Sequence, residues 1–399
     1  MRLAAAAPSS PAAPRGGLGG RLRDAALDLR DRLLASARFR RLAAAFPLTR
    51  RIARAETRAL FDLCAGFVYS QVLAACVRLD LFRRLREAPR TAEEVAALTG
   101  LPVEGAERLL AAAVALRLLD RRSGGRYGLG PLGVVVASDE GVAAMVAHHA
   151  ALYRDLADPV ALLRGERATA VAAYWPYAGA ADAASLAAER VADYSALMAA
   201  SQPMVAAEIL AACRLDRFRA LLDVGGGEGA FLEAVAARHP AVSLALFDLP
   251  AVAERARARL AARGVPAAVF AGDFRRDPIP RGFDAITLVR IAHDHDDATV
   301  SALFRAVRRA LPPGGTLLLA EPLAGTKGAE PVGDAYFGLY LWAMGRGRPR
   351  TADTYRRMLV EAGFGAVRER PTRIPLLVRV LEARAGRGDA YGSASVNHA

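Results

Sequence analysis

The chain has 399 residues, of which 53% are hydrophobic and 24% charged, and its formal net charge is +13. This length and composition predict two globular domains and exclude a largely disordered chain. No uninterrupted apolar run reaches the roughly 18 residues that span a membrane. Three widely spaced cysteines disfavour a disulfide framework or a zinc site and favour a reducing cytoplasm.

The positive charge comes almost entirely from arginine, since Lys327 is the only lysine. Such a charge is compatible with a nucleic-acid partner or an anionic membrane. However, the arginines are scattered along the chain and few aromatic residues lie between them. We therefore expect no nucleic-acid partner and attribute most of the charge to a general bias in composition.

The N-terminal part begins with a low-complexity segment and continues with two helical patterns. Residues 1–20 are rich in alanine, proline and glycine and lack the apolar core of a signal peptide, which predicts a disordered tail. Leucines among arginines predict an amphipathic helix over Arg21–Phe46, ending at Pro47, that packs on protein or contacts a membrane surface. A second helical pattern, Thr57–Arg84, is apolar all round at Phe61–Val77, which predicts a homodimer.

A helix, a turn, a second helix and a hairpin are predicted next. Thr91 begins a capping box before the first short helix, Val103–Leu119 is the second helix, and Arg126–Leu129 is typical of a hairpin. This order is that of a winged helix, which can bind DNA. The second helix offers mainly Arg108 and Arg117 for phosphate contacts, so we expect no DNA binding.

Two further helices are expected at Gly141–Leu163 and Ala183–Ala212, and from Ala220 apolar runs alternate with amphipathic helices. This alternation predicts an α/β fold with a doubly wound, mostly parallel sheet. The last strand is expected at Ile374–Glu382. We expect a helical domain over residues 21–205, the α/β domain over 206–385 and a flexible tail over 386–399.

The most informative stretch is a buried strand that runs into a glycine-rich turn and a helix, Leu221–Phe231. The spacing of Gly225, Gly227 and Ala230 also satisfies the dinucleotide-binding pattern. Two carboxylates, Asp223 and Glu228, stand in or beside this turn, without any arginine or lysine. They oppose a pyrophosphate but suit a ligand with a cationic sulfonium and an amino group.

Acidic residues also follow the next two strands. Asp248, next to Leu249, can accept hydrogen bonds from a ribose diol, and Asp273 with Phe274 offers an acceptor and an aromatic face to adenine. S-adenosylmethionine suits all three carboxylates at the strand ends, whereas a nicotinamide dinucleotide suits only one. S-adenosylmethionine is therefore the expected cofactor.

At these motifs the sequence resembles the caffeic-acid/hydroxyneurosporene class of small-molecule O-methyltransferases, over about Arg50–Arg384. The resemblance implies a Rossmann-like class I methyltransferase domain behind a helical, winged-helix-like dimerisation domain. It also implies an apolar hydroxylated substrate, such as a 1-hydroxycarotenoid, and adds Arg290 to the cofactor site. The motifs that carry it are Asp223–Gly229, Phe247–Pro250, Gly272–Phe274, Leu288–Asp297 and Leu319–Pro322.

Two alternatives stay open beside this resemblance. The acceptor of the methyl group could be another aromatic or polyketide metabolite. A protein of a different class, a winged-helix transcription regulator that senses a ligand, would share the helical domain. Such a regulator would not need a general base at the cofactor.

His293 follows the fourth strand and is the expected general base, a role that the resemblance also assigns to it. Glu321, at the end of the next strand, is expected to hold the other imidazole nitrogen. Where related enzymes often have a second glutamate, this chain has Pro349, which leaves a dyad. A metal site in the acidic segment around His293 is disfavoured, because consecutive residues cannot all face one ion.

The acceptor pocket is expected on two helices that, by the resemblance, cover the cofactor. Its candidate residues are Tyr194, Met198, Phe337, Tyr340 and Met344. Aromatic and methionine side chains suit a long apolar substrate, and ordinary core packing is the alternative. We expect a cytoplasmic protein, with peripheral contact to the inner membrane as an open possibility.

Overall fold

The computed structural model describes residues 18–166, 168–174 and 201–386, and the chain divides into two units, Met1–Leu73 and Ala74–Ala399. The two predicted tails therefore lie outside the described residues, apart from residues 18–20 and 386. The domain boundaries expected near 205 and 385 stay predictions.

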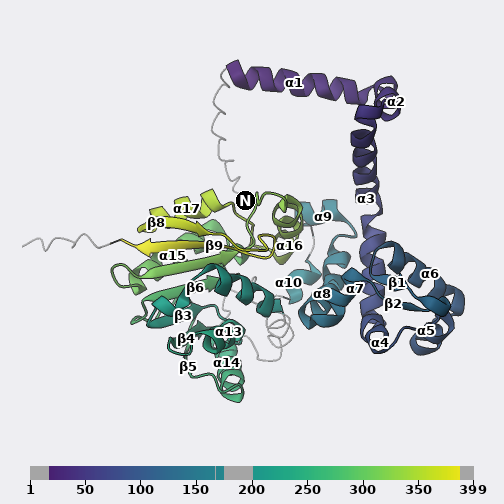
Figure 1. The fold of residues 1–399 in the computed structure, drawn as a ribbon. Helices are drawn as coiled ribbons and strands as arrows, with labels where there is room; N and C mark the ends of the chain where they lie inside the picture. Colours follow the sequence, from purple (N-terminus) through teal and green to yellow (C-terminus); the bar gives the residue numbers. More distant parts are fainter. Residues whose placement is uncertain (1–17, 167, 175–200, 387–399) are drawn as a thin grey trace, which may run out of the picture. The chain divides into compact units, whose positions relative to one another are not determined.

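The first unit contains α1 (Leu18–Ala35), α2 (Ala37–Ala45) and most of α3 (Pro47–Arg78) (Figure 1). The prediction of a single helix over Arg21–Phe46 is wrong, because the helix is interrupted at Ser36. The Ser36 hydroxyl accepts a hydrogen bond from the N–H of Phe39 and caps α2. Pro47 separates the two patterns as predicted and is also the first residue of α3, where its missing N–H is not needed.

Helix α3 exposes much apolar surface. It is long and apolar enough to cross a membrane, with a mean hydropathy of 1.7 in its most apolar window, of which 6% is buried. The search for uninterrupted apolar runs did not find this helix, because isolated polar residues interrupt its sequence. They do not lower its mean hydropathy below that of a membrane-spanning helix. Large exposed apolar side chains on this helix include Leu60, Phe61, Leu63, Phe67 and Val68. Such an exposed apolar surface predicts that another protein or lipid packs against it.

The helical pattern predicted for Thr57–Arg84 is interrupted at Asp80, whose backbone is left-handed (φ 53°), so that α4 (Leu81–Glu87) is a separate helix. The capping box at Thr91 is confirmed. Its hydroxyl accepts the N–H of Glu94, and the Glu94 carboxylate accepts the N–H of Thr91. This box starts α5 (Ala92–Thr99).

The hairpin follows α6 (Val103–Ala115), which ends earlier than predicted because Leu119 belongs to a strand. Strands β1 (Leu119–Arg121) and β2 (Tyr127–Leu129) pair antiparallel, with Leu119 opposite Leu129. The predicted order of two helices and a hairpin is therefore present in the structure.

The single helix predicted for Gly141–Leu163 is also two helices, since Pro159 starts a new one and the carboxylate of Asp158 caps it through the N–H of Ala161. Residues 201–212 are helical, and the rest of the helix predicted for Ala183–Ala212 lies outside the described residues. The helices of this part are α7 (Pro131–Ser138), α8 (Glu140–Asp155), α9 (Pro159–Arg164) and α10 (Ala170–Tyr174).

The C-terminal part is built on a seven-stranded sheet with the order β5-β4-β3-β6-β7-β9-β8. Pairs from β5 to β7 are parallel, and β9 is antiparallel to both its neighbours. The predicted α/β class with a mostly parallel sheet is confirmed. The strands are β3 (Ala220–Val224), β4 (Ser243–Asp248), β5 (Ala267–Ala271), β6 (Ala285–Val289), β7 (Thr316–Glu321), β8 (Phe364–Arg370) and β9 (Arg379–Ala385).

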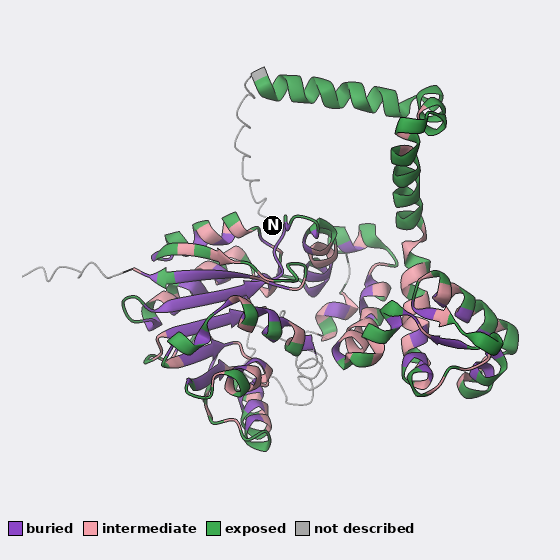
Figure 2. Cartoon of the chain, viewed as in Figure 1, coloured by how far each residue is buried: buried purple, intermediate pink, exposed green. Residues whose placement is uncertain are grey.

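Helices cover both faces of this sheet. One core contains side chains of α15 and α17, and the other contains those of residues 205–213, α13 and α14. The central strands are buried along their length (Figure 2). This burial agrees with their uninterrupted apolar sequences. The helices of this part are α13 (Ala230–Arg238), α14 (Pro250–Ala262), α15 (Asp297–Ala310), α16 (Phe337–Met344) and α17 (Ala352–Glu361).

The C-terminal strands correct the prediction of one strand at Ile374–Glu382. The observed β9 begins and ends later, and β8 was not predicted. Strand β8 lies at the sheet edge and carries Arg368, Glu369 and Arg370, so it lacks the apolar run of a central strand.

Candidate active site

The turn after β3 brings a buried carboxylate under a glycine-rich loop. Asp223 is buried, and its Oδ1 accepts a hydrogen bond from the Thr287 hydroxyl at 2.6 Å. Its Oδ2 is buried and has no hydrogen-bond partner among the described residues. A side chain at Gly226 would stand 2.6 Å from that oxygen, and Gly225 and Gly227 have left-handed backbones. The absence of a side chain at Gly226 thus lets the loop backbone lie close to an unsatisfied acceptor.

Asp248 ends β4 beside the same loop. Its Oδ2 accepts the N–H of Gly227 at 2.8 Å and its Oδ1 accepts the N–H of Leu249 at 2.7 Å. Each oxygen keeps a second lone pair for a ligand hydroxyl. The structure therefore places Asp223, Gly225, Gly227, Asp248 and Leu249 together, as the sequence predicted them to lie.

Burial without a counter-charge raises the pKa of both carboxyl groups. It raises the pKa of Asp223 to about 7, against the hydrogen bond from Thr287. It raises the pKa of Asp248 to about 6, against the N–H groups of Gly227 and Leu249. A cation bound here would stabilise the ionised forms. This electrostatic preference fits a sulfonium and an ammonium better than a pyrophosphate.

Asp273 has a partner that the sequence did not predict. Its carboxylate receives the side chain of Arg275 at 2.8 Å, and although burial raises its pKa, the Arg275 hydrogen bonds lower it on balance. An adenine amine would share this carboxylate with the guanidinium. Phe274 is half-buried, and the edge of its ring meets His295, with centroids 5.3 Å apart.

Arg290 lies directly after β6 in a left-handed backbone (φ 58°), which is uncommon for a residue with a side chain. Its guanidinium donates to the Ser201 hydroxyl at 2.9 Å. The strained turn directs the chain from β6 into the short helix η4 (Ala292–Asp294) that carries His293.

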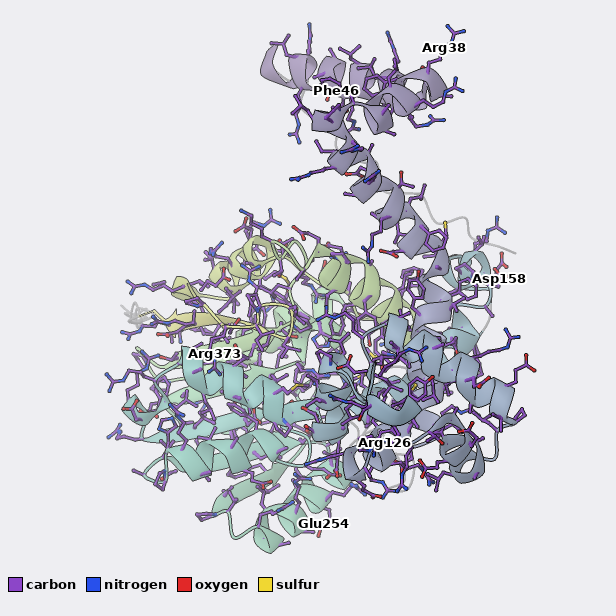
Figure 3. All side chains as sticks on the ribbon, turned by 45° about the vertical axis from the view of Figure 1, so that its right-hand side comes forward. Arg38, Phe46, Arg126, Asp158, Glu254 and Arg373 are labelled. Atoms are coloured by element: carbon purple, nitrogen blue, oxygen red, sulfur yellow. The ribbon has the colours of Figure 1, made fainter. Side chains whose placement is uncertain are left out.

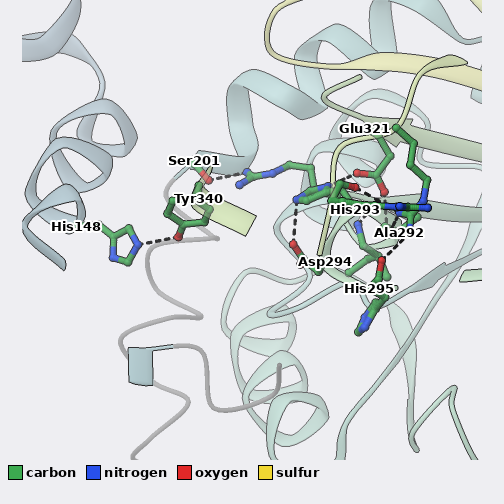
Figure 4. Close-up of polar contacts among 12 residues, drawn as sticks. His148, Ser201, Ala292, His293, Asp294, His295, Glu321 and Tyr340 are labelled. Carbon is green, nitrogen blue, oxygen red and sulfur yellow. Dashed lines mark hydrogen bonds and ion pairs between the residues drawn. The ribbon is translucent and has the colours of Figure 1, made fainter. Parts of the chain in front are cut away.

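His293 and Glu321 form the predicted buried pair (Figure 4). Nδ1 of His293 contacts Oε2 of Glu321, and Oε1 of Glu321 accepts the N–H groups of Ile291 at 3.0 Å and Ala292 at 2.7 Å. Glu321 is fully buried at the end of β7, with 0% of its surface exposed. A carboxylate on Nδ1 assigns the proton to that nitrogen and leaves Nε2 as the acceptor of a neutral imidazole.

A second carboxylate lies on the other side of the ring. Nε2 of His293 is 3.0 Å from Oδ1 of Asp294, within ion-pair range, although that oxygen makes no well-aligned hydrogen bond to any described residue. Burial alone lowers the pKa of His293, but Asp294 and Glu321 outweigh it and raise the pKa above 6.5. Both carboxylates therefore favour the protonated form of the ring over the neutral one.

The loop that carries the pair is held by Arg350, which sequence reasoning missed. Arg350 is 2% exposed, and its guanidinium donates to the carbonyl oxygens of Ala292 at 2.9 Å and His295 at 2.7 Å and to the Asp297 carboxylate at 2.8 Å. A side chain at Gly347 would stand 2.5 Å from the His293 carbonyl oxygen. Among many scattered arginines, no sequence pattern distinguished this one.

The predicted acceptor residues have different outcomes. The Phe337 ring meets the His293 ring edge-on, with centroids 5.8 Å apart, which places it at the base. Tyr340 and Met344 are buried in the core between α8, α9, α10 and α16. Tyr194 and Met198 lie outside the described residues.

Two unpredicted histidines on α8 pair with tyrosines of this region. His148 Nε2 lies 2.7 Å from the Tyr340 hydroxyl and His149 Nε2 lies 2.8 Å from that of Tyr336 (Figure 4 shows the first pair). Burial lowers the pKa of both histidines, that of His148 to about 4, so both are neutral near pH 7. Within the described ranges, no three His, Cys, Asp or Glu side chains are grouped to hold a metal ion.

Two family models match the chain. The O-methyltransferase domain matches residues 153–365 and the O-methyltransferase dimerisation domain matches residues 61–139. These matches give no support to the alternative of a transcription regulator.

Curated relatives and solved structures agree with the family models. Demethylspheroidene O-methyltransferase of Cereibacter sphaeroides is 44% identical over 354 residues, 88% of this chain and 93% of that protein. The enzyme of the same name from Rhodobacter capsulatus is 42% identical, with 89% of each chain covered. The structure of human N-acetylserotonin methyltransferase with SAM has a TM-score of 0.69 and 26% identity, covering 83% of this chain and 98% of that one.

Proposed function

This chain belongs to the O-methyltransferase family and uses S-adenosylmethionine as its methyl donor, and from this premise we propose that it methylates a hydroxyl group of a hydroxycarotenoid. The observation that carries the substrate is the 44% identity, over 88% of the chain, to an enzyme named for demethylspheroidene. Aromatic side chains beside the base, among them Phe337, suit a long apolar molecule.

The cofactor would be held by the residues around the glycine turn. Asp223 offers its unsatisfied Oδ2 to a cationic group, and Asp248 offers its free lone pairs to the ribose hydroxyls. The Phe274 ring and the Asp273 carboxylate would face the adenine. Bound S-adenosylmethionine supplies a methyl group on a positively charged sulfur. The protein's contribution is to align an acceptor hydroxyl with that methyl, which can provide roughly 7–11 kcal/mol.

His293 would take the proton of the acceptor hydroxyl at Nε2. Glu321 keeps the Nδ1–H oriented and stabilises the imidazolium that results. Because Asp294 and Glu321 favour the charged ring, His293 must first lose its proton. A positive charge beside the ring lowers the pKa of the imidazole, so a cationic cofactor bound nearby would favour the neutral form that can accept a proton.

The assembly and the compartment are also proposals. We infer a homodimer from the match to the dimerisation domain and the exposed apolar side chains of α3. The three cysteines, Cys64, Cys76 and Cys213, are all free, which fits a reducing cytoplasm.

Methyl transfer from labelled S-adenosylmethionine tests the substrate. The full-length protein is incubated with a hydroxycarotenoid, with N-acetylserotonin and with a hydroxynaphthoate, since relatives of about 31–34% identity are named for the last two classes. We expect label in the hydroxycarotenoid alone. Label only in an aromatic acceptor would overturn the substrate proposal and retain the family.

A further inference from the structure

Helices α1 and α2 and the start of α3 expose large apolar side chains in a strongly basic segment. Residues 18–54 contain ten arginines and three aspartates, and residues 36–54 contain six arginines and no acidic residue. The exposed apolar side chains are Leu22, Leu27, Leu29, Leu33, Leu34, Phe39, Leu42, Phe46, Leu48 and Ile52. The dimerisation domain match begins only at residue 61, so it does not account for this surface.

The arrangement around α1 is regular. At 3.6 residues per turn, the leucines at positions 22, 29 and 33 form one stripe along the helix. Arginines flank this stripe on both sides, at positions 21 and 32 on one and at 23 and 30 on the other. The aspartates at positions 24, 28 and 31 lie away from the stripe. Long arginine side chains beside an apolar stripe can reach past it toward anions.

The same pattern continues through α2 and into α3. Phe39, Leu42 and the C-cap residue Phe46 have the i, i+3, i+7 spacing of one helix face, with Arg38 at its edge and Arg41 farther round, on the polar side. Arg38 and Phe46, both labelled in Figure 3, are exposed residues of this segment. Leu48 and Ile52 form the corresponding apolar face at the start of α3.

We propose that α1, α2 and the start of α3 form a binding surface for an anionic lipid membrane. Exposed leucine and phenylalanine would enter the headgroup boundary while arginines pair with lipid phosphates. A second copy of this chain would bring an equal excess of positive charge against the surface, which opposes self-association here. Nucleic acid would satisfy the arginines but leave the leucine stripe exposed. The proposal does not depend on the substrate.

Vesicle co-flotation of the full-length protein tests this surface. We expect binding to vesicles of phosphatidylglycerol and phosphatidylcholine, much less to phosphatidylcholine alone, and weaker binding as salt rises. Arg38→Glu with Arg41→Glu should lower the partition coefficient about tenfold or more, since each arginine near an anionic surface contributes roughly fivefold. The control, Arg305→Glu with Arg309→Glu on α15, changes the net charge equally and should retain binding.

Leu29→Asp and Leu27→Asp form a matched pair for the apolar stripe. Leu29 is 58% exposed on the stripe, whereas Leu27 is 37% exposed on another side of the same helix. Only Leu29→Asp should weaken vesicle binding. The proposal would be overturned by the absence of binding to anionic vesicles at low salt, by equal losses in variants and controls, or by tighter binding to duplex DNA. Conversion of a dimer to a monomer by Leu29→Asp without vesicles would instead assign the surface to a second copy, and would overturn it too.

Discussion

At the scale of single residues, the site is dominated by one imidazole between two carboxylates. Glu321 contacts Nδ1 of His293 and Asp294 stands 3.0 Å from Nε2. The first contact orients a base, whereas the second occupies the nitrogen that would accept the proton. An acceptor hydroxyl would therefore have to enter between Nε2 and the Asp294 carboxylate.

His293→Ala should lower kcat by about 10²–10⁴-fold and leave the affinity for S-adenosylmethionine nearly unchanged, because the residues that we propose to hold the cofactor lie around Gly225 and Asp248. Steady-state kinetics and calorimetry measure the two effects, with activity in EDTA as a control for metal. Full activity of this variant, or loss of activity with chelator, would contradict the assignment.

Glu321→Gln should be nearly as damaging as His293→Ala, although glutamine has almost the same shape as glutamate. Oε1 accepts two backbone N–H groups, so the amide oxygen of a glutamine would take that place. Its NH₂ would then face Nδ1 and force the proton onto Nε2, the wrong tautomer for a base. We expect kcat to fall at least ~10²-fold; a fall of less than tenfold would show that orientation alone suffices.

The raised pKa of His293 predicts how kcat depends on pH. The base must be neutral, and carboxylates that raise its pKa move the rising limb of kcat to higher pH. In the wild type kcat should still increase above pH 7. Asp294→Asn removes one of the two charges and should move that limb toward lower pH. If the rising limb of kcat stays at the same pH in Asp294→Asn, Asp294 does not affect the pKa of His293.

Binding of S-adenosylmethionine should weaken in acid. Burial raises the pKa of Asp223 to about 7 and that of Asp248 to about 6, so the free protein protonates both as pH falls through this range. A cation needs the ionised forms, and Kd should rise about tenfold or more between pH 8 and pH 5.5. Asp223→Asn should flatten the upper part of the profile. A Kd independent of pH in a folded protein would remove both carboxylates from the cation's site.

At the scale of elements, the segment 347–350 fixes the loop that bears His293. Arg348 donates its backbone N–H to the His293 carbonyl oxygen at 2.9 Å. The Arg350 guanidinium donates hydrogen bonds to Ala292, His295 and Asp297. Pro349 lies inside this segment, and the anchoring contacts come from its two neighbours.

Arg350→Met should destabilise the fold by about 2–4 kcal/mol, because two carbonyl oxygens lose charged donors in a buried place. It should also lower kcat more than it changes the Kd of S-adenosylmethionine. Arg348→Met is the matched control, since its exposed ion pair with Asp297 should be worth less than about 1 kcal/mol. Equal effects of the two variants in urea unfolding and kinetics would refute the anchoring role.

Some elements of the fold could be predicted from the sequence and others could not. Buried strands ending in acidic residues, such as β3 with Asp223 and β4 with Asp248, were predictable because their apolar runs and turns are local signals. Breaks at Ser36 and Asp80 were not, since no proline or glycine marks either position. The buried contacts of Arg350 were also unpredictable, because its partners are far from it in sequence.

At the scale of the whole molecule, the exposed apolar part of α3 has the largest consequence. Leu63 and Phe67 are 81% and 70% exposed and one helical turn apart, within the residues matched by the dimerisation domain. A single chain that left them in water would expose a hydrophobic patch prone to association.

Light scattering should therefore show a dimer at micromolar concentration. Leu63→Asp with Phe67→Asp should give monomers, because two carboxylates would be buried without partners. Val360→Asp, at an exposed position of α17, should leave the dimer intact. A well-behaved monomer in the wild type would contradict this prediction.

The place of β9 in the sheet bears on how the enzyme is made in the cell. Strand β9 pairs with β7 along its whole length, from Thr316 opposite Arg384 to Glu321 opposite Arg379. It is translated after every other strand that the structure describes. Until it emerges from the ribosome, β7 is an edge with unpaired backbone groups, open to other nascent chains or to chaperones. Completion of the sheet beside Glu321 thus depends on the strand synthesised last, so a ribosome that stalls before β9 should leave an intermediate prone to aggregation.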